Sequence, residues 1–139
     1  MIKIGFEQID HTADVGIHSF GDDIEEAFED AAKGMFSIMT DISDVENKVE
    51  RNVKIEADNL ESLLVNFLSE LIYLHEIHEE FYAGFDVEIK ENEIIILIAK
   101  IKGEKIDLEK HEIEGEVKAV SYHELTIDPE GEIRLILDI

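Results

Sequence analysis

The chain has 139 residues, close to the commonest size of a single domain, and 45% of them are hydrophobic, enough to form a buried core. Its 12 Lys and Arg against 35 Asp and Glu give a net charge of −23, which argues against direct nucleic-acid binding, because that binding depends on cations that neutralise phosphates. The absence of cysteine excludes disulfides and thiolate metal sites and fits a cytoplasmic protein. No apolar run reaches the roughly 18 residues that a membrane span needs, so no membrane association is expected.

The first half of the chain is typical of two short strands, a helix and a third strand. A polar loop from Asp10 to Asp14 separates the first two strands. From Ile24 to Met39 the apolar residues recur at helical spacing, and Asp22 or Asp23 is placed to cap the first turn. The expected elements are strands at 4–10, 15–20 and 48–57 and a helix at 22–40.

The second half begins with another helix and then changes to a period of two. Asp58 is expected to cap a helix whose apolar face is wide. After His78 the alternation of apolar and charged residues predicts an antiparallel meander. Turns are predicted at Glu91-Asn92, at Gly103-Glu104 and at Asp128-Pro129-Glu130-Gly131, with strands at 85–89, 94–99, 117–128 and 133–139.

This order of elements predicts one α+β domain over residues 1–139, with a mostly antiparallel sheet and both helices packed on it. No Gly/Ser-rich or low-complexity stretch suggests a linker. The two halves, each a helix followed by strands, also suggest an internal duplication.

Two places concentrate oxygen ligands. The segment Asp10-His11-Thr12-Ala13-Asp14-Val15-Gly16 holds two carboxylates, an imidazole and a hydroxyl, although local turn chemistry would explain the same residues. In the last strand the apolar residues share one face, so Asp138 points the other way, beside the terminal carboxylate of Ile139. Such oxygens suit Ca²⁺ or Mg²⁺, and the alternative is a frayed, solvated terminus.

The histidines give weaker indications. His75 and His78 are three residues apart on one helix, a spacing that could hold a transition metal but that also suits the helix dipole. His123 shares strand parity with apolar residues and is predicted to be a buried core histidine. The sequence contains no activated nucleophile, no Gly-rich phosphate loop and no hydrolase motif, so nothing in it indicates catalysis.

The opening motif from Asp10 to Gly16, followed by a helix with Ala27-Phe28, resembles the start of archeases. The stretch from Gly115 to His123 and the ending Leu137-Asp138-Ile139 resemble that family's closing part, with Ser121 where many members have Thr. The resemblance covers essentially the whole chain. It implies a strand-rich body with two helices and a calcium-type site at Asp14, Asp138 and Ile139.

The resemblance also implies a role. Archeases promote guanylylation of the RtcB-type tRNA-splicing RNA ligase, allow it to turn over repeatedly and widen its choice of nucleotide, and they are not enzymes themselves. Two other classes stay open on the residues alone. One is a generic chaperone or metal-binding module, and the other is a metal-dependent hydrolase built on His11, Asp14 and Asp138.

Overall fold

The computed structural model describes residues 5–10 and 14–139, which form seven strands, two α-helices and one short 3₁₀-helix. Their bounds in chain order are β1 Gly5–Asp10, β2 Asp14–Phe20, α1 Ile24–Met39, η1 Ile42–Asp44, β3 Val49–Ala57, α2 Leu60–His78, β4 Glu80–Glu91, β5 Ile95–Lys105, β6 Ala119–Asp128 and β7 Glu132–Asp138.

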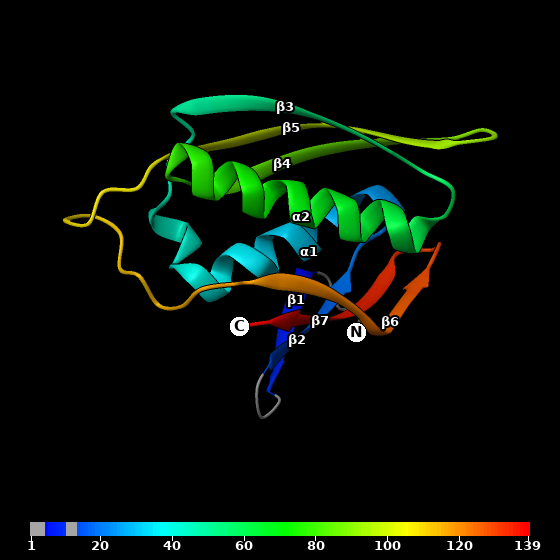
Figure 1. The fold of residues 1–139 in the computed structure, drawn as a ribbon, viewed down its shortest axis with the longest axis horizontal. Helices are drawn as coiled ribbons and strands as arrows, with labels where there is room; N and C mark the ends of the chain where they lie inside the picture. Colours follow the sequence, from blue (N-terminus) through cyan, green and yellow to red (C-terminus); the bar gives the residue numbers. More distant parts are fainter. Residues whose placement is uncertain (1–4, 11–13) are drawn as a thin grey trace.

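The fold has three layers, with both helices between two antiparallel sheets (Figure 1). One sheet has the strand order β1-β2-β7-β6 and the other β3-β5-β4. Helix α1 contacts β2 and β4, and α2 contacts β6 and β3, so each helix touches both sheets. The α+β class and the two packed helices are confirmed. The single sheet of the prediction is in fact two, since the helices are apolar enough to be covered on opposite sides.

The core lies in the helix layer. The rings of Phe28 on α1 and Phe67 on α2 stack with their centroids 6.3 Å apart, and both side chains are fully buried. Ile17 on β2 and Leu97 on β5 are fully buried as well, so both sheets contribute to the same core. Burial of one such side chain stabilises the fold by roughly 1.5–3 kcal/mol.

The helix caps follow local side-chain chemistry. Asp23, one of the two predicted residues, caps α1, and its side chain accepts a hydrogen bond of 2.8 Å from the Glu26 amide. The prediction of Asp58 as the cap of α2 is wrong by one residue. Asn59 has the extended backbone of a cap and accepts a hydrogen bond from the Ser62 amide at 2.8 Å. Asp and Asn cap helices about equally well, so the pair alone does not indicate which residue is used.

The predicted turn at Gly103-Glu104 is also wrong. Both residues lie inside β5, where Gly103 pairs with Val49 on one side and Tyr82 on the other. A Cβ at position 103 would collide with the Phe81 carbonyl, so the glycine is needed for close strand approach and not for a turn. The pair Glu91-Asn92 does lie at the β4–β5 turn.

The last hairpin forms where it was predicted. The Gly131 amide donates to the Asp128 carbonyl at 2.9 Å, which closes the turn between β6 and β7. Strand β6 begins at Ala119, two residues later than predicted. One sheet combines β1 and β2 from the start of the chain with β6 and β7 from its end, so the two sheets do not correspond to the two halves of the chain. The internal duplication stays a prediction. Within the described residues, no helix combines the length and apolar character needed to cross a membrane.

Candidate functional site

Asp14 and Asp138 lie directly opposite each other. Asp14 is the first residue of β2, Asp138 is the last of β7, and the antiparallel register pairs the two. Opposite residues in such a pair share a face and have Cβ atoms about 4.5–5.5 Å apart. Two like charges placed directly opposite each other repel and destabilise such a strand pair.

The carboxylate pair opens into a surface pocket of about 420 Å³. Asp14 is half-buried there and Asp138 is exposed, so one carboxylate lies deeper than the other. Strand β6 forms the other wall, because Ala119 pairs with Asp138 on the side away from Asp14. The pocket is lined by Asp14, Ala119, Val120, Ser121, His123, Ile136 and Asp138.

His123 lies in this pocket and not in the core, so its predicted burial is wrong. Its side chain is 78% exposed. The pairing of β6 with β7 is interrupted between Ser121 and Thr126, and Glu124 has a left-handed φ of 58°. This irregularity breaks the alternation on which the prediction rested. The His123 amide donates to the Ser121 hydroxyl at 2.9 Å, which fixes the start of the irregular stretch.

The third predicted ligand, Ile139, directly follows Asp138 and its side chain is 40% exposed. In the described part of the chain, no three or more His, Cys, Asp or Glu side chains are grouped closely enough to hold a metal ion. The side-chain oxygen donors that the structure pairs at this strand end are the carboxylates of Asp14 and Asp138. This donor set has the hard chemistry that Ca²⁺ accepts, and it is short of the six to eight oxygens that Ca²⁺ takes, so water or a partner would complete it.

The other predicted histidines have different surroundings. His11 lies outside the described residues. The Nδ1 of His75 donates to the Glu80 carbonyl at 2.7 Å, and its ring stacks on Phe81 at 5.4 Å between centroids. The His78 carbonyl accepts a hydrogen bond from Lys105. His75 thus has a structural role at the end of α2, which supports the structural alternative for the pair over metal binding.

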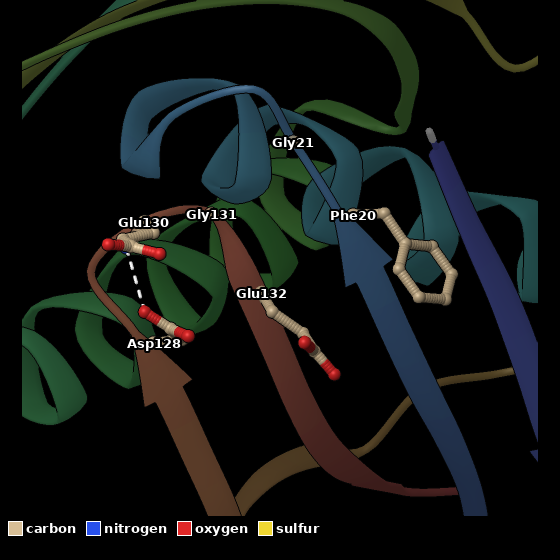
Figure 2. Close-up of a pocket in the computed structure, with 6 residues that line it drawn as sticks. All are labelled: Phe20, Gly21, Asp128, Glu130, Gly131 and Glu132. Atoms are coloured by element: carbon tan, nitrogen blue, oxygen red, sulfur yellow. Dashed lines mark hydrogen bonds between the residues drawn. The ribbon is translucent and has the colours of Figure 1, made fainter. Parts of the chain in front are cut away.

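A second pocket, of about 240 Å³, lies at the opposite end of the β2–β7 pair (Figure 2). It is acidic, since Asp128, Glu130 and Glu132 line it, and Asp128 accepts a hydrogen bond from the Glu130 amide. Glu132 also contacts the buried His18, whose Nε2 is 2.7 Å from a Glu132 oxygen and whose Nδ1 is 3.2 Å from a Glu7 oxygen. The His18 ring therefore links β1, β2 and β7.

A buried ion cluster, missed from the sequence, is centred on Glu104. Glu104 is 5% exposed and accepts hydrogen bonds from the Glu46 amide at 2.6 Å, from Lys110 at 2.8 Å and from His111 Nε2 at 3.2 Å. Burial raises the pKa of the Glu104 carboxyl, but these donors outweigh it and lower the pKa to about 2. We call these four residues the Glu104 cluster. No sequence pattern indicated it, because Glu104 has the strand parity of the exposed Ile98, Lys100 and Lys102.

Comparisons with known proteins agree with this architecture. Residues 6–139 match the sequence model of the Archease protein family (MTH1598/TM1083). The protein archease of Pyrococcus furiosus is 44% identical over 91% of each chain, and that of Methanothermobacter thermautotrophicus is 43% identical over 97% of this chain and 99% of its own.

Two solved structures share the fold. The solution structure of Methanobacterium thermoautotrophicum protein 1598 aligns with a TM-score of 0.82 at 42% identity, over 97% of this chain and 99% of that one. The crystal structure of an archease and possible chaperone from Thermotoga maritima aligns with a TM-score of 0.61 over 96% of both chains, at 18% identity. The family match over nearly the whole chain and these identities show that the chain belongs to the archease family.

Proposed function

We propose that this chain is an accessory protein of an RtcB-type RNA ligase and acts in tRNA splicing. It promotes guanylylation of the ligase, permits multiple turnover and widens nucleotide use, without catalysing a reaction itself. The observation that carries the proposal is the direct pairing of Asp14 with Asp138 in an exposed pocket of an archease-family chain. The sequence-based expectation of a cytoplasmic location belongs to the same proposal.

The cation in this proposal is Ca²⁺, held by the carboxylates of Asp14 and Asp138 and by Ile139. When bound, it supplies a positive charge that offsets the repulsion between the carboxylates. The two aspartates have different roles in this site. Asp14 is half-buried and fixes the inner position, while the exposed Asp138 leaves the outer side accessible to a partner.

The charge of the chain favours a protein partner over RNA. A net charge of −23 repels phosphate backbones at long range and attracts basic protein surfaces. An activator of this charge would therefore contact the ligase, and the ligase would bind the RNA.

A general chaperone is the second candidate, and one observation favours it. Several large apolar side chains are exposed, among them Leu108 at 77%. The related Thermotoga structure is described as a possible chaperone. Suppression of aggregation of an unrelated protein, at ratios that have no effect on the ligase, would favour this candidate.

The deciding assay uses catalytic amounts of the chain with its ligase, GTP and Ca²⁺, and it counts ligations per ligase molecule. We expect several turnovers with the chain and about one without it. No gain over ligase alone would reject the activator function. Hydrolysis of phosphoesters without any ligase would instead favour the hydrolase alternative.

The metal site is tested by Asp138→Ala, with Asp44→Ala as the control. Asp44 is an exposed carboxylate at the end of η1, away from the pair. Asp138→Ala should lower Ca²⁺ affinity in calorimetry at least tenfold and reduce ligase activation with it. Asp14→Ala should behave alike, and the double variant should be little worse, because groups that act as one unit are not additive. An Asp138→Ala chain that binds Ca²⁺ and activates normally would reject the site and leave the family intact.

A further inference from the structure

The irregular segment 106–118 between β5 and β6 is fixed to the body of the protein. The Glu114 amide donates to the Met39 carbonyl at 2.8 Å, and the Thr40 hydroxyl donates to the Glu112 carbonyl at 2.7 Å. The Glu104 cluster fixes the first half of the segment, because Lys110 and His111 lie in the segment and bind Glu104 of β5. The segment therefore has a defined conformation, and the side chains that it exposes are held in place.

This fixed segment and the end of α2 expose large apolar side chains. Leu108 is 77% exposed and Ile113 is 53% exposed. On α2, Tyr73 is 54% exposed and Ile77 is 51% exposed, and their spacing of four residues places them on one helix face. Exposed apolar side chains on a fixed backbone gain free energy when a partner covers them.

A pocket of about 310 Å³ lies between the end of α2 and this segment, and of the four exposed apolar side chains Ile113 lines it. Its helix side includes Glu76, which lies three residues after Tyr73 and one before Ile77, and its other side includes Ile113. The full lining is His75, Glu76, Phe81, Ile106, Ile113, Gly115, Glu116 and Val117. Apolar residues thus surround a cavity that can receive a side chain of a partner.

The rim of this surface is acidic. Lys110 does not neutralise further carboxylates of this surface, because its ammonium group is already paired with Glu46 and Glu104 at 2.8 Å each. A second copy of this chain would meet the surface with its own net charge of −23, so the partner is expected to be basic. Glu76 and Glu116 line the pocket, and the end of α2 and segment 106–118 also expose Glu79, Glu109, Glu112 and Glu114, against one exposed lysine of the segment, Lys118.

We propose that the C-terminal half of α2 and segment 106–118 form the docking surface for a basic amphipathic segment of the partner protein. Under the proposed function, on which this identification rests, that partner is the ligase. An apolar side chain of the segment enters the pocket between Glu76 and Ile113, and its Lys or Arg residues pair with the rim. Apolar anchors surrounded by complementary charges give such interfaces both affinity and register.

The test is a double variant, Ile77→Ser with Ile113→Ser, and its matched control is Ile94→Ser with Ile98→Ser. The control residues are 47% and 43% exposed and lie in or next to β5, so both variants remove similar apolar surface. Since all four side chains are exposed, both variants should fold, which thermal melting and retained Ca²⁺ binding would check. We expect the first variant to weaken ligase binding at least tenfold in calorimetry, and the control to bind like the parent chain.

The outcomes separate this proposal from the function on which it rests. Normal ligase binding by the first variant, while the parent chain activates the ligase, would overturn the docking surface and leave the function intact. Equal losses in both variants would overturn it too, because the effect would then not be local. A parent chain that neither binds nor activates the ligase would overturn both proposals.

Discussion

The clearest quantitative prediction concerns Glu104→Gln. The carboxylate is 5% exposed, and its donors are the Glu46 amide, Lys110 and His111, at 2.6 to 3.2 Å. Its pKa falls from the ordinary 4.5 to about 2. At about 1.36 kcal/mol per pKa unit, this corresponds to roughly 3 kcal/mol of stability at neutral pH. Glutamine has nearly the same shape but no charge, so the variant should lose about 2–3 kcal/mol, and its Tm should fall by on the order of 10 °C.

The pH dependence gives the sharper assay. Because the pKa of Glu104 is lower in the folded chain, its contribution is complete above about 4.5 and disappears as the pH falls toward about 2. The charged or titratable groups near the carboxyl are Lys48, Lys110, His111 and Glu46. Urea unfolding at pH 7 and pH 3 should therefore show a parent-to-variant difference that shrinks at the lower pH.

Glu116→Gln serves as the control, since Glu116 is exposed and should change stability by less than about 0.5 kcal/mol. A Glu104→Gln chain as stable as the parent at pH 7 would refute the assigned role of the Glu104 cluster. A difference as large at pH 3 as at pH 7 would refute the electrostatic explanation and point to packing instead.

Two further predictions concern charge. In the absence of metal, Asp138→Asn should stabilise the fold by about 0.5 kcal/mol, because it removes one of two like charges that face each other. Added Ca²⁺ should raise the Tm of the parent chain but not that of the variant. Equal Ca²⁺ effects in both chains would contradict this. The association rate with the ligase should fall as NaCl rises, because the Debye length shrinks from about 10 Å at 0.1 M to about 3 Å at 1 M, and stopped-flow rates independent of salt would count against electrostatic steering.

Periodicity predicted the helices and most strands because their apolar residues recur at the spacing of a helix or of a strand. Helix α1 buries the predicted Phe28 and Met35, and it also buries residues outside the predicted stripe, such as Phe36, because both sheets cover it. The errors fall where tertiary contacts override local preference. Gly103 looks like a turn residue but is required where β5 passes close to Phe81, and only the three-dimensional arrangement makes that visible.

The candidate site was predictable only in part. The alternation in the last strand places Asp138 off the apolar face, and the structure agrees. Its pairing with Asp14 depends on the register of two strands from opposite ends of the chain, which no local pattern contains; the family resemblance supplied it. The position of His123 was predicted wrongly, because side chains of an irregular strand do not alternate regularly between its two faces.

The segment 115–121 connects the two candidate surfaces. Its first residues, Gly115 to Val117, line the pocket beside α2, and Ala119 to Ser121 line the pocket of the carboxylate pair. Between them, the Lys118 amide donates to the Asp138 carbonyl at 2.8 Å, so the backbone of the metal-site strand is bonded to the docking segment. A partner that covers the first pocket therefore lies within a few residues of the second. Under the proposed function, a ligase that docks on the first pocket would therefore also come close to the strand end that carries Asp14 and Asp138.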